Sequence, residues 1–345
     1  MRVLVTGHNG YIGSVMVPVL TAAGNDVFGV DTGFYADCTL GLGEPIVRGV
    51  RQDVRDVTAT DLKGFEAVVH LAALSNDPLG SLNPALTDDI NHQATVHLAK
   101  LAKEAGVGRF VYASSCSMYG AGEGDALLDE TSPLQPLTPY AESKLRSEED
   151  LHKLATKKFS PIYMRNATAY GMSPRFRADI VLNNLMCWAY TTGRVRVMSD
   201  GSPWRPLVHV EDICRATAAL LAAPREAVHD QAFNIGVAGE NYQVRDLVNI
   251  VCEVVEGAEA EYAARGGAVD KRNYRVDFAK FARVLPEFKP KWDARKGAEQ
   301  ILAAFKDAGF KPDDFHLGRF TRLAKLQSLL ESKALDASLR WTRPA

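Results

Sequence analysis

The sequence lacks long hydrophobic runs and a net charge of either sign, and each absence excludes a class of protein. None of the apolar stretches in its 345 residues reaches the roughly 20 residues that a membrane-spanning helix needs. The formal net charge of −2 gives no sign of the basic surface that is typical of nucleic-acid-binding proteins. We therefore expect neither a membrane nor a nucleic acid as partner.

Cysteine is also scarce: the five cysteines are scattered and form no CxxC pair. This spacing argues against a zinc site or a disulfide framework and suits a reducing compartment. The first expected strand begins at Arg2, which leaves no room for a secretory signal. We expect a cytoplasmic protein without a bound metal. The length and the 46% hydrophobic content fit one large globular domain or two coupled domains.

The first half of the chain alternates short apolar stretches with helical patterns. The expected strands are Arg2–Thr6, Asp26–Val30, Ala67–Leu71, Arg109–Ala113 and Pro161–Arg165. Helices are expected up to about Ala23, with a bend at Pro18, and over Pro84–Ala105 and Pro139–Thr156. Strands separated by helices favour parallel βαβ units. We therefore predict a Rossmann-type, doubly wound α/β fold.

Beyond about Ala169 the pattern is less regular and predicts a smaller C-terminal α+β lobe. We expect the Rossmann domain to cover residues 1–169, with returning segments near 207–236. The lobe would then consist of residues 170–206 and 237–314. Residues 315–345 form a helical tail, to which the sequence assigns no function.

A glycine-rich turn, TGHNGYIG, joins the first expected strand to the first helix. Its glycines Gly7, Gly10 and Gly13 permit a tight turn and a close approach of the backbone to a diphosphate. The helix N-terminus adds unpaired N–H groups and a partial positive charge. The strand–turn–helix context favours a dinucleotide site over a purely structural turn.

Asp31 ends the second expected strand, 18 residues after Gly13. A carboxylate there accepts hydrogen bonds from ribose hydroxyls and repels a 2′-phosphate, which favours NAD over NADP. No arginine adjoins Asp31 in the chain to hold such a phosphate. The alternative interpretation is a turn cap. NAD is the predicted cofactor.

Tyr140 and Lys144 are four residues apart, which places them on one face of a helix that Pro139 opens. A nearby positive charge favours the phenolate, so we expect the tyrosine pKa to be lowered towards neutrality. Such a tyrosine can remove a hydroxyl proton while hydride leaves the same carbon. The alternative is an ordinary pair on a helix surface.

A serine-rich stretch, ASSCSMYG, follows the expected strand Arg109–Ala113. It lies at the strand end where ligands bind in open α/β sheets. A hydroxyl there could hydrogen-bond the reacting oxygen of a substrate, and a simple turn is the alternative.

Together these features resemble the extended short-chain dehydrogenases/reductases, in particular the nucleotide-sugar epimerase/dehydratase group. The resemblance covers about residues 1–290 and rests on TGHNGYIG, HLAA, SSCSMYG, PYAESK, NNL, WRPLVHVED and FNIG. It implies an NAD-dependent enzyme that acts on a nucleotide-diphosphate sugar. It also implies a homodimer in which the helices at Pro84–Ala105 and Pro139–Thr156 pair across a two-fold axis.

The resemblance further implies roles for individual residues. The implied catalytic residues are Ser115, Tyr140 and Lys144. The implied cofactor-binding residues are Gly7, Gly10, Tyr11, Ile12, Gly13, Asp31, Asp53, Val54, Leu71, Ala72, Ala73, Asn91, Tyr140 and Lys144. The implied substrate-binding residues are Ser115, Thr168, Asn184, Arg205 and Arg272. Arginine suits a diphosphate because its planar fork pairs with two phosphate oxygens.

Two departures from the family pattern narrow the reaction. Sugar 4,6-dehydratases place an Asp-Glu pair directly after the active-site threonine, where this chain has Cys116 and Ser117. Related uronate decarboxylases have a glutamate at the position of Ser117. Neither residue is a carboxylic acid, so elimination of water is not expected. Thr168 stands where many relatives have asparagine, which leaves the contacts to the sugar ring open.

The leading hypothesis is a nucleotide-sugar epimerase that acts at C4 through a transient 4-keto intermediate. A net NAD-dependent oxidoreductase on the same substrates would use the same residues. A non-catalytic NAD-binding regulator is a third possibility, against which the presence of Tyr140, Lys144 and Ser115 argues.

Two loop features keep two interpretations each. Arg175 and Arg177 either reach phosphate or sugar or belong to a solvated loop. Asp77 either touches a sugar hydroxyl or, since Pro78 follows it, forms a turn.

Overall fold

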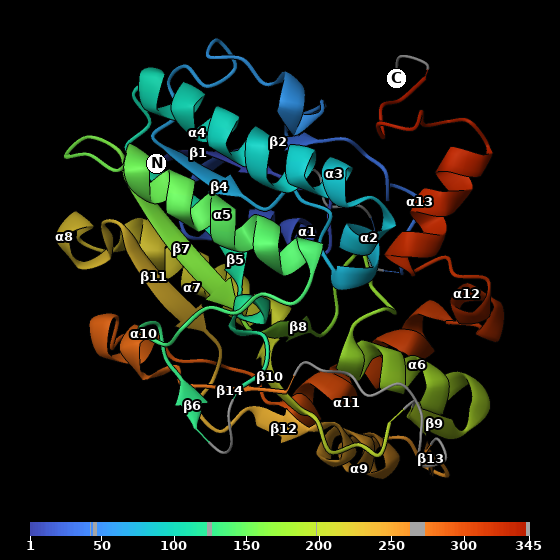
Figure 1. Ribbon diagram of the computed structural model, residues 1–345. Helices are drawn as coiled ribbons and strands as arrows, with labels where there is room; N and C mark the ends of the chain where they lie inside the picture. Colours follow the sequence, from blue (N-terminus) through green and yellow to red (C-terminus); the bar gives the residue numbers. More distant parts are fainter. Residues whose placement is uncertain (42, 44–46, 123–125, 198, 263–272, 343–345) are drawn as a thin grey trace.

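A parallel sheet of seven strands forms the centre of the molecule (Figure 1). The structure is a computed structural model that describes the chain except residues 42, 44–46, 123–125, 198, 263–272 and 343–345. In spatial order the strands are β11 (Gln231–Ile235), β7 (Ser160–Asn166), β5 (Arg109–Ser115), β4 (Ala67–His70), β1 (Arg2–Thr6), β2 (Asp26–Asp31) and β3 (Gly49–Arg51). The predicted doubly wound α/β fold is confirmed.

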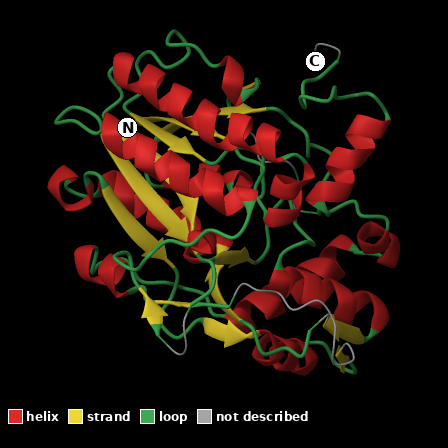
Figure 2. Cartoon of the chain, in the orientation of Figure 1, coloured by secondary structure: helices red, strands yellow, loops and turns green. Residues whose placement is uncertain are grey.

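Both faces of this sheet are covered by helices, as Figure 2 shows. The covering helices are α1 (Gly13–Ala22), α7 (Val210–Ala222), α4 (Ala94–Glu104) and α5 (Pro139–Leu154). Successive residues of a strand point to opposite faces. Accordingly, Val3 and Val5 of β1 pack in the core that contains α1 and α7. Leu4 lies in the core that contains α4 and α5. The central strands are therefore buried on both sides.

The helix predicted over Pro84–Ala105 forms without a break, but it is not α-helical throughout. A short helix, α3 (Pro84–Thr87), is joined to α4 by a π-helical turn, η2 (Asp88–Gln93). This wider turn places Asn91 against the loop that follows β4, where its side chain bonds to the backbone of Leu74. Such π turns inside α-helices are frequent at functional sites.

A second, smaller lobe has its own core, distinct from the two faces of the main sheet. Its strands are β8 (Thr168–Tyr170), β10 (Trp204–His209), β12 (Asn241–Gln243), β9 (Arg194–Val197), β13 (Glu259–Tyr262), β6 (Leu127–Leu128) and β14 (Arg275–Val276). Its main helices are α6 (Val181–Thr192), α9 (Val244–Val254) and α11 (Ala294–Ala308). Short elements elsewhere are η1 (Val54–Asp56), α2 (Asp77–Leu82), η3 (Cys116–Tyr119), α8 (Arg225–Val228) and α10 (Ala279–Val284).

The chain crosses between the two parts more often than the sequence indicated. The segment near 207 was expected to return to the first domain, but β10 pairs with β8 and β12 of the lobe. Only α7, which follows it, packs beside α1, and β11 then forms the edge of the main sheet. Similarly, α10 packs on β11, with the rings of Phe281 and Phe233 5.8 Å apart. The division of the chain into domains stays a prediction.

The C-terminal tail runs back from the lobe along the Rossmann domain (red in Figure 1). It contains α12 (Pro312–His316) and α13 (Arg322–Glu331). Leu326 and Leu335 of the tail share a buried cluster with Phe34 and Leu74. Further along, Trp341 donates its indole N–H to the carbonyl oxygen of Thr32, at 2.8 Å. The tail therefore covers the loops that follow β2 and β4. Within the described part of the chain, no helix combines the length and apolarity required to span a bilayer.

Candidate active site

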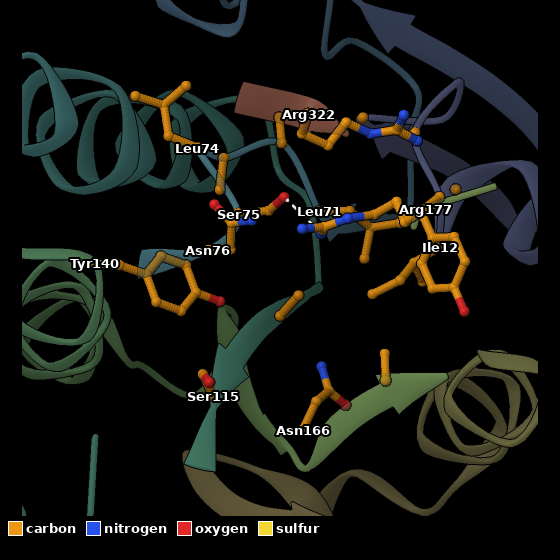
Figure 3. A pocket seen from close by; sticks show the side chains of 18 of the residues that line it. Ile12, Leu71, Leu74, Ser75, Asn76, Ser115, Tyr140, Asn166, Arg177 and Arg322 are labelled. Atoms are coloured by element: carbon orange, nitrogen blue, oxygen red, sulfur yellow. Dashed lines mark hydrogen bonds between the residues drawn. The ribbon is translucent and has the colours of Figure 1, made fainter. Parts of the chain in front are cut away.

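A cavity of about 410 Å³ lies at the carboxyl ends of the central strands. The strand order reverses there between β1 and β4, which is where doubly wound sheets bind ligands. The glycine loop, the loops after β2 and β4, the end of β5 and the start of α5 line it, together with residues of the lobe and the tail. Figure 3 shows side chains from these segments converging on one space.

The glycine loop must carry glycine where it meets the loop after β4. Gly7 has a positive φ of 74°, and a Cβ atom on it would lie 2.9 Å from the backbone nitrogen of Ala72. A Cβ atom on Gly13 would lie 2.1 Å from the carbonyl oxygen of Gly7. The backbone therefore carries no side chain at Gly7 and Gly13, both of which line the cavity. Helix α1 begins at Gly13. This arrangement fits a bound diphosphate.

Asp31 is oriented into the same cavity by backbone hydrogen bonds. Its carboxylate accepts from the N–H groups of Asn9, at 3.0 Å, and Gly33, at 2.7 Å. An arginine does lie beside it, because Arg51 of β3 is in register with Asp31. Arg51 donates to the carbonyl oxygen of Thr32, and its guanidinium lies 4.0 Å from the centre of the Trp341 ring. No arginine adjoins Asp31 along the chain, as the sequence shows, but one lies beside it on the neighbouring strand.

Asp53 and Val54 also line the cavity, at the start of η1. Burial raises the pKa of Asp53, but the hydrogen bonds and charge of Arg55 outweigh it, so that the pKa lies below its ordinary value. The guanidinium of Arg55 bonds both carboxylate oxygens, at 3.0 and 2.8 Å. Asp53 is therefore held by an ion pair, and its contact to an adenine stays a prediction.

Leu71, Ala72 and Ala73 form the wall between the glycine loop and the catalytic residues. Asn91, expected among the cofactor ligands, lies behind this wall and is buried. Its side chain accepts from Leu74 N, at 2.8 Å, and donates to Leu74 O, at 3.1 Å. Asn91 therefore holds the loop, and its contact to the cofactor stays a prediction.

Tyr140 enters the cavity from the first turn of α5. Thr138 caps this helix by accepting a hydrogen bond from the N–H of Ala141. The phenol of Tyr140 is directed into the cavity towards the end of β5, where Ser115 lies (Figure 3). The expected lowering of its pKa is wrong. Burial, reinforced by the carboxylate of Asp77, raises the pKa of Tyr140 to about 12 despite the opposing effect of Ser115.

Lys144 is itself buried, and for this reason its charge does little to lower the pKa of Tyr140. Burial lowers the pKa of Lys144 to about 7, so that the ammonium is only partly charged at neutral pH. Its Nζ donates to the carbonyl oxygen of Ala113, at 2.6 Å, and lies 5.8 Å from the centre of the Tyr140 ring. The pair does share one face of α5, as the spacing predicts.

The two residues that replace the acidic pair of dehydratases differ in their exposure to the cavity. Cys116 is fully buried, and its thiol donates to the carbonyl oxygen of Arg165. Burial raises the pKa of this thiol far above its ordinary value. Ser117 lines the cavity, and its backbone N–H donates to the side-chain oxygen of Ser115, at 3.1 Å. Neither residue can supply an acid–base group at neutral pH.

The predicted substrate residues divide into three groups. Ser115, Thr168 and Arg205 line the cavity. Asn184 is not part of its wall, because its side chain donates to the carbonyl oxygen of Ala178, at 2.8 Å. Arg272 lies outside the described residues.

The structure adds cavity residues that the sequence left undecided or did not indicate. These are Ser75, Asn76, Asp77, Arg177, Asp179 and Arg322. Arg177 is buried in an ion pair with Asp179, at 2.8 Å, so it does not belong to a solvated loop. Asp77 faces the cavity and accepts a hydrogen bond from Thr138, at 2.5 Å. An acidic residue before a proline gave a partial signal for Asp77, whereas nothing local marks Arg322.

Comparison with known proteins places this arrangement in a family. The model of the NAD dependent epimerase/dehydratase family matches residues 3–236. The chain belongs to this family. It is 28% identical to a protein of Mycolicibacterium smegmatis named UDP-glucose 4-epimerase, over 89% of this chain and 99% of that one.

Solved structures agree with this assignment. The structure of MoeE5 in complex with UDP-glucuronic acid and NAD is 28% identical, with a TM-score of 0.75 over 89% of this chain and 99% of that chain. DesIV, a dTDP-glucose 4,6-dehydratase from Streptomyces venezuelae solved with NAD, is 26% identical, with a TM-score of 0.76 over 90% and 99%. This chain is therefore an enzyme, and NAD is its cofactor.

Proposed function

We propose that the chain is a nucleotide-sugar epimerase that inverts C4 of the sugar through a transient 4-keto intermediate. The observation that carries this proposal is the meeting of Ser115, Tyr140 and Lys144 in one cavity with the dinucleotide loop. The name of the mycobacterial relative, UDP-glucose 4-epimerase, supports the same reaction. MoeE5 binds a UDP-sugar together with NAD, which supports the substrate class.

The residues of the chain account for the proton transfers of this reaction. Tyr140 accepts the proton of the C4 hydroxyl, and Ser115, which lines the same cavity at the end of β5, orients that hydroxyl. Bound NAD supplies the hydride acceptor. Lys144 stabilises the phenolate in the fraction of molecules in which it is charged. The same groups act in reverse when the ketone is reduced from its other face.

The acidic residues of the cavity wall argue against elimination of water as the main reaction. Asp53 and Asp179 are held in ion pairs by arginines. Asp31 accepts two backbone hydrogen bonds at the dinucleotide end. Asp77 is hydrogen-bonded to Thr138 beside the catalytic tyrosine. Among the described residues that line the cavity, no carboxylate therefore replaces the missing acid at Cys116 and Ser117.

The test is to incubate the purified protein with UDP-glucose and to follow UDP-galactose by NMR without added reductant. Interconversion without net formation of NADH supports the epimerase. Stoichiometric NADH with release of a 4-keto sugar would show a net oxidoreductase instead. Tyr140→Phe is expected to reduce turnover by about 10²- to 10⁴-fold, because it removes the acid–base group. The NAD content of this variant should not change.

We also infer that the enzyme is a homodimer in the cytoplasm. All five cysteines are free, which suits a reducing compartment. The helices α4 and α5, which pack side by side on one face of the sheet, are expected by resemblance to meet their copies across a two-fold axis.

A further inference from the structure

Arg322 is a buried cation in the cavity wall, and it comes from a segment outside the matched residues 3–236. It is the first residue of α13, and its side chain is 2% exposed. One guanidinium nitrogen, Nη2, donates to the carbonyl oxygen of Arg175, at 2.7 Å. The other, Nη1, is buried and has no hydrogen-bond partner among the described residues. A buried donor without a partner lowers the stability of the fold. Nη1 is therefore suited to donate to an acceptor on a bound ligand.

The charge of Arg322 is not neutralised by a neighbouring residue. Asp179 is the nearby carboxylate, but it is engaged by Nε and Nη2 of Arg177, at 2.8 and 3.1 Å. Nowhere in the described ranges does a carboxylate lie within ion-pair distance of Arg322. Burial and the charge of Arg177 both lower the pKa of Arg322, which means that the surroundings destabilise its charged form. One carboxylate thus lies near two guanidiniums and forms an ion pair with only one of them, Arg177.

The position of the pair points to the cofactor rather than to the sugar. The guanidinium of Arg322 lies 4.5 Å from the centre of the ring of Tyr35, in the loop after β2. Both arginines act electrostatically on Tyr11 of the glycine loop. In Figure 3 they lie across the cavity from Ser115 and Asn166. Arg177 also donates to the hydroxyl of Ser75, at 3.1 Å, in the loop that continues the Leu71–Ala73 wall.

We propose that Arg322 and Arg177 bind the diphosphate of NAD, and that the C-terminal tail serves to deliver Arg322 to this site. The diphosphate carries two negative charges, which match the uncompensated cation and the orphaned Nη1 donor. The glycine loop supplies backbone N–H groups on one side of the diphosphate, and the arginine pair closes the other side. The tail is held in place by Leu326, Leu335 and Trp341, which pack on the loops after β2 and β4. This inference rests on the cofactor and not on the identity of the sugar.

The test is to measure nucleotide binding by calorimetry to nucleotide-free protein, with no sugar turnover involved. Arg322→Met is expected to weaken NAD and ADP-ribose by about 10- to 100-fold, as for loss of a charge-assisted hydrogen bond. UDP binding should change by less than about 2-fold in this variant. Arg322→Lys, which keeps the charge but not the planar fork, should lose less affinity. Arg319→Met is the matched control, because Arg319 precedes the same helix but pairs with Asp314 at the surface.

Thermal unfolding separates a binding role from a structural one. Removing an uncompensated buried cation should leave the midpoint of nucleotide-free Arg322→Met unchanged or higher, while its shift on adding NAD becomes smaller. A lower midpoint with undiminished NAD affinity would mean that Arg322 only holds the tail, and the proposal would be wrong. Weaker UDP binding with unchanged NAD binding would assign the pair to the substrate and would equally overturn it.

Discussion

At the scale of single residues, the titration of Lys144 should be visible in the stability of the whole chain. The pKa of this lysine is lowered by burial from 10.5 to about 7. Between these values the unfolded chain carries a proton that the folded chain lacks, so the free energy of unfolding should rise with pH across this window. The slope from one such group is at most about 1.4 kcal/mol per pH unit.

The measurement is urea unfolding of the wild type and of Lys144→Met at several pH values from 7 to 10.5. Methionine keeps most of the buried volume and does not titrate. The wild type should therefore gain stability relative to the variant as the pH increases. Parallel curves for the two proteins would show that the lysine titrates normally in the folded state.

Local spacing was enough to predict the residues whose partners are close in sequence. The glycine turn, Asp31 and the Tyr140–Lys144 pair each belong to one strand–turn–helix or helix segment, and all of them line the cavity. Spacing could not predict the pKa of Tyr140, because that depends on burial and on Asp77, which lies on another loop. It also missed Arg51, whose place beside Asp31 follows from strand register.

At the scale of elements, the π-helical turn η2 should prove necessary for the active-site loop. Asn91→Ala would leave the backbone N–H and carbonyl of Leu74 without their present partners. Each buried group that loses its partner costs about 1–3 kcal/mol. We therefore expect a loss of stability in urea unfolding together with a fall in kcat, because Ser75, Asn76 and Asp77 follow Leu74 directly.

Asn83→Ala provides a matched control for this change. Asn83 caps α3 by accepting from the N–H of Leu86, at 3.1 Å, in an exposed position. Its loss should cost about 1 kcal/mol and leave kcat unchanged. If Asn91→Ala instead kept its stability and lost only NAD affinity, Asn91 would be a direct cofactor ligand, as the family resemblance implied.

Apolar periodicity could not distinguish η2 from a continuous α-helix. The pattern of Pro84–Ala105 predicts one helix, and a π turn is a single-turn insertion in a helix that continues on both sides of it. The reason for the turn is a tertiary contact, between Asn91 and a loop that precedes it by 17 residues. The same holds for β10, whose place in the lobe is decided by pairing with β8.

At the scale of the whole molecule, we expect two copies to associate through α4 and α5. Sedimentation equilibrium should give twice the mass of one chain. Leu145→Glu places a charge on a partly buried position of α5 and should shift the equilibrium towards monomer. Leu317→Glu is the control, because Leu317 is 79% exposed in the tail, away from these helices. A wild-type monomer at micromolar concentration would contradict the proposed dimer.

The role of the tail could not be predicted, because its partners are distant in sequence. Trp341 bonds to Thr32, which is 309 residues away, and Arg322 bonds to Arg175, 147 residues away. A helical pattern alone marks the segment as helix and does not say which surface it covers.

If Arg322 binds the diphosphate as proposed, its buried charge should tie the amount of folded protein to the dinucleotide supply of the cell. A ligand that binds only the folded chain stabilises it by mass action, by about 2.7 kcal/mol at one hundred times its dissociation constant. In the proposed site the unpaired donor and charge of Arg322 lower the dissociation constant of the dinucleotide, so they enlarge this stabilisation at any given concentration. When the dinucleotide is scarce, more of this enzyme unfolds and is open to proteases, so its abundance should follow the concentration of its own cofactor.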